Sequence, residues 1–294
     1  FQPKRTSKHS FTPFKLTFNV LRDPTEAFKE LQAENPALYV SLRDQFIPVF
    51  EYMYTYDNAS LPGVRNPIWW QTTVSSAGNL TSCIYRIFGK SFKEKDKKLL
   101  GVPFAQFLKL NSEFRYHYRI DKNQMIASRI AGGVIWSYGN ATTAPYTEQF
   151  YIGGANSVRA FSARSIGPGG YPPETDRKYT YINHVGDIRI EANIEYRFRM
   201  IADLHGAVFL DAGNVWLMRK DENRPNGEFT LKNFPKQIAL GTGFGLRYDL
   251  DFLVFRLDLG IGLHDPYDTG KSGYYNIPKF KDSMALHFAI GYPF

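Results

Sequence analysis

The feature that most limits how this chain can fold is a regular alternation of apolar and polar residues over long segments. In residues 108–120, LKLNSEFRYHYRI, mainly apolar side chains occupy one parity and mainly charged side chains the other. Residues 188–200 and 284–294 repeat the pattern. Successive side chains of a β-strand point to opposite faces, so a period of two predicts strands with one apolar and one polar face.

This pattern predicts ten strands joined by connections that alternate in length. The expected strands are 11–21, 44–56, 67–82, 102–120, 124–138, 186–200, 205–216, 237–249, 252–263 and 283–294. The long connections are 22–43, 83–101, 139–185, 217–236 and 264–282, and the short ones are 57–66, 121–123, 201–204 and 250–251. In an up-and-down meander this alternation places all long connections at one end, as in outer-membrane β-barrels. A Greek-key sandwich has no reason to sort its loops in this way.

Composition agrees with a membrane barrel and excludes several other classes. Aromatic residues make up 16% of the chain, which suits girdles at the membrane interfaces, where Trp69 and Trp70 are expected. No apolar run reaches the roughly 18 residues that a transmembrane helix needs. The net charge of +8 is dispersed over the alternating segments, so nucleic acid is not an expected partner. The single Cys83 cannot form an intrachain disulfide, and no metal-ligand spacing or catalytic motif stands out. We therefore expect neither an enzyme nor a cofactor.

Two of the long connections have local features of their own. Asp23 and Pro24 predict the cap and first turn of a short helix that ends before Pro36. Residues 91–101 are rich in charge and are expected to form a solvated loop.

The longest connection contains the glycine-rich segment FYIGGANSVRAFSARSIGPGGY at 150–171. Gly153 and Gly154 permit unusual backbone angles, and the apolar residues Val158 and Phe161 flank Arg159. A phosphate-binding loop is excluded because no helix signature and no Lys-Ser/Thr pair follows the glycines. Long loops of this kind are functional or disordered, and these anchors favour a folded segment.

The stretch GGANSVRAF resembles the loop motif of the BamA/TamA-like outer-membrane assembly factors, whose usual form is Val-Arg-Gly-Phe. The segments GDIRIEANIEYRF, GAVFLDAGNVW and HFAIGYPF resemble the same family, in the same order along residues 150–294. Within this family, the chain resembles the long-looped TamA-like proteins of the Bacteroidetes. The resemblance implies an all-β, transmembrane, up-and-down antiparallel β-barrel of about sixteen strands in the Gram-negative outer membrane, preceded by periplasmic domains that bind clients.

Ten visible strands are fewer than this family has. We therefore expect residues 1–294 to be the outer-membrane β-barrel domain without its upstream strands and periplasmic domains. The start at Phe1, with no initiator Met or signal peptide, also indicates a processed or truncated chain. A complete ten-stranded barrel is the alternative, and its function would be that of a passive pore or an unrelated surface protein.

The resemblance implies that loop 139–185 folds back into the lumen, where Arg159 meets acidic residues of adjoining strands. Glu195 and Asp211 are the implied partners, with Glu191 as a third, and their parity independently points them inward. An unpaired buried charge costs about 3–5 kcal/mol, so such a network fixes the loop in place. The residues alone, without the resemblance, predict that Arg159 is a solvated loop arginine.

Two further features bear on this site. Ala160 stands where the family has Gly, and it is strained by about 1–2 kcal/mol if a positive φ is required there. The terminal strand, with Tyr292 and Phe294, resembles the signal by which outer-membrane barrels are recognised for insertion; an ordinary interface aromatic is the alternative. Gly291 weakens this strand, where a seam is expected.

The implied function is assembly, insertion or translocation of proteins at the outer membrane, through a lateral seam at which a client strand pairs with an exposed edge. The expected partners are outer-membrane lipids, nascent outer-membrane or exported proteins, and accessory assembly subunits or an inner-membrane-anchored partner. Two alternatives stay open. One is a two-partner secretion transporter with a single substrate, and the other is a passive outer-membrane pore.

Overall fold

The structure, a computed structural model, is almost entirely antiparallel β-sheet in its regular elements. It describes residues 5–34, 39, 42–92, 94–95, 97–173, 180–250 and 252–294. Among the described helices, none combines the length and the apolar character that crossing a membrane requires.

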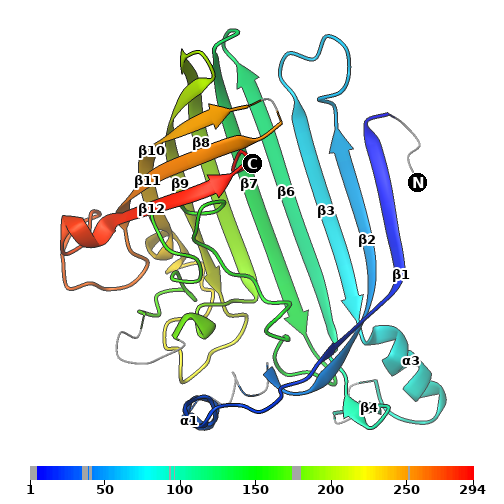
Figure 1. The fold of residues 1–294 in the computed structure, drawn as a ribbon. Coiled ribbons are helices and arrows are strands. Elements are labelled where there is room, and N and C mark those ends of the chain that lie inside the picture. The colour runs from blue at the N-terminus through cyan, green and yellow to red at the C-terminus, as the bar shows by residue number, and fades with distance from the viewer. Residues whose placement is uncertain are drawn as a thin grey trace. The chain divides into compact units, whose positions relative to one another are not determined.

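Ten strands form one large sheet in which neighbours in the sequence are neighbours in space (Figure 1). These strands are β1 (Ser7–Asn19), β2 (Gln45–Asp57), β3 (Ile68–Ala77), β6 (Phe107–Arg119), β7 (Gln124–Ser137), β8 (Ile188–Ile201), β9 (Leu204–Trp216), β10 (Ala239–Asp249), β11 (Val254–His264) and β12 (Met284–Ile290). The remaining elements are the hairpin β4 (Lys98–Leu99) and β5 (Val102–Pro103), the helices α1 (Glu26–Glu34) and α3 (Asn79–Ile87), and 3-10 turns at Thr180–Ile182, Phe234–Gln237 and Phe280–Ser283. The predicted meander of ten strands is confirmed.

Three local predictions are wrong, each for a local reason. The strand predicted at 67–82 ends at Ala77, because Gly78 adopts a left-handed φ of 66° and α3 begins directly after it. The strand predicted at 102–120 is divided into β5 and β6. The short helix predicted before Pro36 is present as α1, but it begins at Glu26, and its cap is Thr25, whose Oγ1 accepts from the Phe28 amide at 3.3 Å, rather than Asp23.

The chain divides into two compact units, and the division runs through β2, β3, β6 and β7. The first unit comprises Phe1–Thr55, Gln71–Ser112 and Gly133–Gln149, and the second comprises Tyr56–Trp70, Glu113–Gly132 and Phe150–Phe294.

In the first unit, Asn140 holds the segment before β4 against the fully buried Phe104. The Asn140 side chain accepts from the Lys97 amide at 2.7 Å and donates to the Lys97 and Phe104 carbonyls at 2.9 and 2.8 Å. Lys97 is consequently buried, and its Nζ donates to the Phe92 carbonyl at 2.7 Å. The prediction of a solvated loop over 91–101 is therefore wrong at this lysine.

In the second unit the usual relation between polarity and burial is reversed. Along β8, Glu191, Glu195 and Arg197 are buried, whereas Ile194 and Tyr196 are exposed. The same reversal holds for the exposed apolar residues Val208, Leu210, Phe244, Leu246, Tyr248, Phe255 and Leu257 of β9, β10 and β11. A sheet in water buries its apolar face, so this arrangement suits a sheet whose apolar face contacts lipid.

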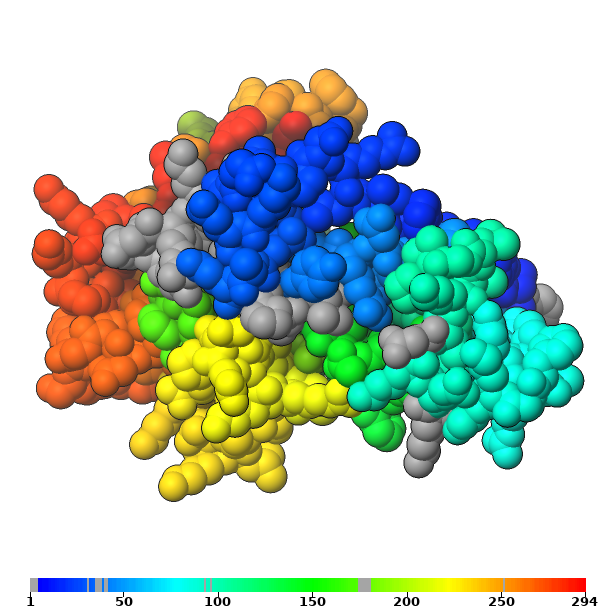
Figure 2. Space-filling model, turned by 90° about the horizontal axis from the view of Figure 1, so that it is seen from below, coloured from blue at the N-terminus to red at the C-terminus, as the bar shows by residue number. Residues whose placement is uncertain are grey.

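The second unit also sorts its connections by length. The β6–β7 and β8–β9 turns lie at one end of the strands, and the connections that follow β9 and β11 lie at the other (Figure 1). Figure 2 looks onto this second end, where residues of the β9–β10 connection (yellow) and of the β11–β12 connection (orange to red) cover the surface. The predicted separation of short turns from long loops is confirmed here.

The reversed burial predicts how the second unit responds to a charge on its apolar face. We expect Ile194→Lys to lower the free energy of unfolding in lipid vesicles by about 2–4 kcal/mol if the residue lies near the bilayer centre. The matched control is Leu231→Lys in the β9–β10 connection, where the side chain is 83% exposed and the change should stay within about 0.5 kcal/mol. Denaturant titration in vesicles measures both, and equal effects would contradict a lipid-facing β8.

Candidate functional site

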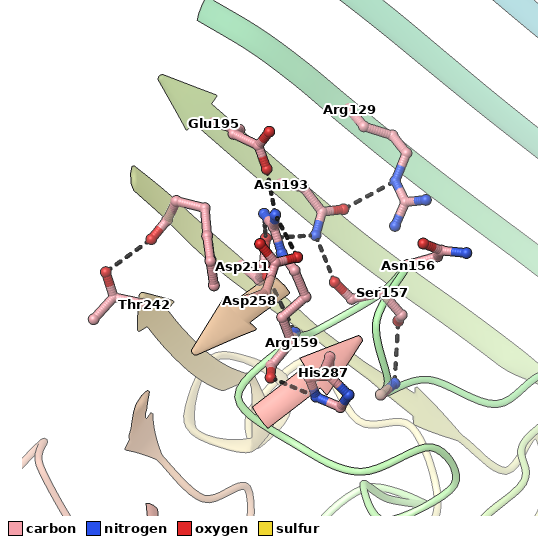
Figure 3. A network of polar contacts seen from close by, with 12 residues as sticks. Arg129, Asn156, Ser157, Arg159, Asn193, Glu195, Asp211, Thr242, Asp258 and His287 are labelled. Carbon is pink, nitrogen blue, oxygen red and sulfur yellow. Dashed lines mark hydrogen bonds and ion pairs between the residues drawn. The ribbon is translucent and has the colours of Figure 1, made fainter. Parts of the chain in front are cut away.

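The candidate site is the polar face of β8–β11, against which part of the β7–β8 connection lies. Arg159, in that connection, is 0% exposed, and its side chain extends toward Glu195 and Asp211 (Figure 3). Its Nε and Nη2 donate to the two Asp211 oxygens at 2.8 and 2.9 Å, and its Nη1 donates to Glu195. The Arg159 backbone amide also donates to Asp211, at 3.0 Å. A two-pronged guanidinium–carboxylate pair of this kind fixes orientation as well as distance.

The surroundings of Arg159 favour its charged form. Burial acts to lower the pKa of Arg159, but the hydrogen bonds and charges of Asp211 and Glu195 outweigh it, so the pKa is raised above its ordinary value. The guanidinium carbon lies 3.5 Å from the centroid of the Phe209 ring, and the two groups form a cation–π contact. The arginine is therefore permanently charged and fully enclosed.

Strand register explains why these partners converge. β8 and β9 pair antiparallel, with Asn193 opposite Asp211 and Glu195 opposite Phe209. Positions two apart on a strand share a face, so both carboxylates and the ring point to the same side. Asn193 completes the arrangement, since its Nδ2 donates to Asp211 at 2.8 Å and to the Ser157 carbonyl of the loop at 3.0 Å.

A second layer of charges extends this network onto β10 and β11. Glu195 also accepts from Arg197 at 2.7 Å and from Arg247 at 3.1 Å. Asp258 lies 2.6 Å from Arg247 Nη1, 3.5 Å from Arg256 Nε and 3.8 Å from Arg159 Nη1. Sequence reasoning missed Arg247, Arg256 and Asp258, although their parity on β10 and β11 was a usable signal.

The loop backbone approaches the sheet closely because β10 and β11 carry glycines on this face. A Cβ on Gly260 would lie 2.2 Å from the Arg159 carbonyl oxygen, and one on Gly241 would lie 2.3 Å from the Ala160 Cβ. From β12, His287 Nε2 lies 2.9 Å from the same Arg159 carbonyl. We call Gly241 and Gly260 together the glycine seat. The alternating glycines in GTGFG and DLGIG were a second signal that sequence reasoning missed.

The turn that presents Arg159 is built by its own glycines. Gly153 and Gly154 have φ values of 96° and 92°, and the Gly154 amide donates to the Phe161 carbonyl at 2.7 Å. Val158 is fully buried. Ala160 does not have a positive φ, so the strain considered for this substitution does not arise. Its methyl group instead faces Gly241 of the glycine seat.

Glu191, Tyr292 and Phe294 contact neighbours of Arg159 in the network rather than Arg159 itself. Glu191 does not contact Arg159; it pairs with Arg129, whose Nε also donates to Asn193 at 2.9 Å. The strand predicted to run to Phe294 ends at Ile290, and Gly291 follows with a φ of 82°.

After Gly291 the chain runs back toward β8. Phe294 is only 6% exposed, its carbonyl accepts from Arg197 at 3.2 Å, and its ring lies under the guanidinium groups of Arg197 and Arg129. It is therefore not an exposed interface aromatic. Tyr292 is exposed, and its ring lies 4.6 Å from the Arg197 guanidinium carbon.

Two expectations concern residues outside the charge network. Trp70 is exposed, as a girdle residue would be, and Trp69 lies 4.4 Å from the Arg115 guanidinium carbon. In the described part of the chain, no three or more His, Cys, Asp or Glu residues are grouped so that they could hold a metal ion.

Comparison with known proteins identifies the family. A model of the Omp85 superfamily domain matches residues 100–294, which include the whole arginine network. The chain belongs to the Omp85 superfamily. The protein is accordingly an outer-membrane β-barrel protein of Gram-negative bacteria, and the reversed burial of its second unit agrees with this location.

Individual relatives support this assignment over parts of their length. The chain is 27% identical over 184 residues to the outer membrane protein assembly factor BamA of Nitratidesulfovibrio vulgaris, which covers 62% of this chain and 20% of that protein. Its fold is similar to the crystal structure of BamA from Haemophilus ducreyi lacking POTRA domains 1–3, with a TM-score of 0.53, 13% identity, and coverage of 85% of this chain and 44% of that one. It is also similar to CdiB from Escherichia coli, with a TM-score of 0.51, 14% identity, and coverage of 84% and 37%.

The buried ion pairs predict a large effect of removing the arginine from this Omp85 chain. We expect Arg159→Ala to lower the free energy of unfolding by about 3–5 kcal/mol, because it leaves Asp211 and Glu195 buried without their partner. The free energy of unfolding of Arg159→Lys should lie between those of the unaltered protein and Arg159→Ala. An ammonium group keeps the positive charge but cannot reproduce the two-pronged contact with Asp211.

Denaturant unfolding in detergent and protease cleavage of the loop measure this effect. Arg164→Ala in the same loop is the control; its guanidinium lies over the Tyr151 ring, and its loss should cost about 1 kcal/mol or less. A double-mutant cycle of Arg159→Ala with Asp211→Asn should be strongly non-additive. Additive effects would refute the pairing.

The glycine seat makes a separate prediction. We expect Gly260→Ala to displace the loop, because the added Cβ overlaps the Arg159 carbonyl, with a cost of about 1–3 kcal/mol and faster proteolysis within the loop. Gly132→Ala is the matched control, since its Cβ would meet the nearest atom at an ordinary 3.7 Å. Equal protease resistance of the two variants would show that the loop does not rest on this seat.

Proposed function

We propose that this protein assembles, inserts or translocates other proteins at the outer membrane. The observation that carries the proposal is the fully buried Arg159 network, which fixes a long connection against the polar face of an Omp85 sheet. A passive pore needs an unobstructed polar face, and it has no need of a connection fixed there by buried ion pairs. The relative in Nitratidesulfovibrio vulgaris is named as an outer membrane protein assembly factor, and we propose the same role for this protein.

In the proposed mechanism the loop acts as a strut inside the lumen. Arg159 links β8 and β9 through Glu195 and Asp211, and Asp258 draws β11 into the same cluster. This cluster would hold β8, β9 and β11 together on their polar face. Since Glu195, Asp211 and Asp258 pair with arginines from other segments of the chain, separating these strands would leave buried charges without partners. The network would therefore keep this part of the barrel rigid while another part opens.

We place the lateral seam at the edge of β12. In the described part of the chain, β12 has β11 as its one neighbour in the sheet and is the last strand in the sheet order. It is short, and Gly291 ends it with a left-handed backbone. An unpaired edge presents backbone donors and acceptors to an incoming strand. A client strand would add there, which would allow its transfer into the membrane.

The partners follow from the faces that the structure presents. Outer-membrane lipids would cover the exposed apolar side chains of β8–β12. Nascent outer-membrane or exported proteins would be the clients, and accessory assembly subunits or an inner-membrane-anchored partner would act with the protein. No catalytic step or cofactor enters this proposal.

Depletion of the protein in cells tests the proposal. We expect the levels of many outer-membrane proteins to fall, and we expect Arg164→Ala but not Arg159→Ala to restore them at equal expression. Loss of a single exported substrate would indicate a dedicated secretion transporter instead. Unchanged levels of all outer-membrane and exported proteins would overturn the proposal.

A further inference from the structure

A second polar feature of the second unit lies at the end of the strands with the short turns. It is a cavity of about 430 Å³, within the usual size range of ligand pockets. Its walls come from the end of β6, the β6–β7 turn, the start of β7, and parts of β8, β9 and β10. Its basic lining residues are Arg119, Lys122, Arg197, His205 and Arg247, and Asp121 is the one carboxylate in the described lining.

Strand register places a row of basic residues beside this cavity, and two of them, His205 and Arg247, line it. Arg199 lies opposite His205, His205 lies opposite Arg247, and Arg247 lies opposite Arg256. These four residues form one row across β8–β11, on the face that also carries the Arg159 network. Of these, Arg247 and Arg256 are like charges directly opposite one another, a pairing that destabilises a sheet unless anions compensate it.

The carboxylates of the Arg159 network do not fully compensate this charge. Three carboxylates, Glu195, Asp211 and Asp258, pair with four guanidinium groups, those of Arg159, Arg197, Arg247 and Arg256.

Unused donors also line the cavity. Arg247 is 0% exposed, and its Nε has no hydrogen-bond partner among the described residues. Within the same described residues, no carboxylate lies in ion-pair distance of Arg119 or Lys122, which are both exposed. The cavity therefore combines excess positive charge with donors that an anion would satisfy.

We propose that this cavity binds an acidic polypeptide segment through its carboxylate groups. Met125, Phe198 and Tyr292 line the same cavity, so apolar surface lies between the cationic groups. A polypeptide that alternates carboxylates with apolar side chains covers both kinds of surface, whereas a small inorganic anion covers only one. The identity of the polypeptide as a client arriving at the short-turn end rests on the proposed function; the existence of the site does not.

Peptide binding to the full chain, folded in detergent micelles, tests the inference. The probe is a fluorescent octapeptide of alternating Glu and Phe, and the comparison probes are the corresponding Lys–Phe peptide and inorganic phosphate. We expect saturable binding of the acidic peptide that weakens as salt rises from about 0.05 to 0.5 M, because screening reduces contacts between exposed charges.

Variants locate the site. We expect the double substitution Arg119→Ala and Lys122→Ala to weaken binding about five- to tenfold, from two exposed charge contacts. Both residues are exposed and outside the Arg159 network, so folding should survive. Lys220→Ala, which removes an exposed lysine in the β9–β10 connection at the other end of the strands, should leave binding unchanged.

Three outcomes would overturn the inference. Equal binding of the acidic and basic peptides would exclude charge recognition, an unaffected double variant would place the site elsewhere, and full competition by millimolar phosphate would indicate a small-anion site. Because the assay uses purified protein, absent peptide binding alongside a depletion phenotype would overturn this inference alone. Peptide binding without a depletion phenotype would overturn the proposed function alone.

Discussion

The second unit depends on one interaction, the buried contact of Arg159 with Asp211 and Glu195. A charged group without solvent is tolerated only where opposite charges and hydrogen bonds replace water, and here each carboxylate serves more than one donor. Glu195 alone contacts three arginines from three segments of the chain. The position of the loop, the spacing of β8–β11 and the positions of the glycines are therefore linked, because a shift of any one of them separates buried charges from their partners.

This network requires the sheet to be reversed relative to a soluble protein. The face that carries Glu195, Asp211 and Asp258 is buried under the loop, and the face that carries Ile194 and Leu210 is exposed. Such an arrangement is stable where the surroundings of the exposed face are apolar, as they are for an outer-membrane barrel. The same reversal lets one face meet lipid while the other supports polar recognition, both at Arg159 and at the basic cavity near the short turns.

Much of the fold could be predicted because its signal is local. A period of two fixes which residues share a face, and loop length fixes how strands are joined, so the meander was readable before any contact was known. The errors occur where a single residue or a distant partner decides the outcome. Gly78 ends β3 through its backbone angle, and Lys97 is buried because Asn140, far away in the sequence, holds its backbone.

The sequence by itself determined the parity of the strands, and the resemblance directed attention to Arg159, Glu195 and Asp211, which the structure brings together. Only the tertiary structure decided which acid meets which arginine. Glu191 has the same parity as Glu195 yet pairs with Arg129, and Asp258 joins the network from β11. The physical reason is that parity repeats every two residues, whereas an ion pair needs a particular register between strands and a particular depth of the loop. The glycines on β10 and β11 set that depth by the space they leave empty, so it emerges only when the strands and the loop are placed together.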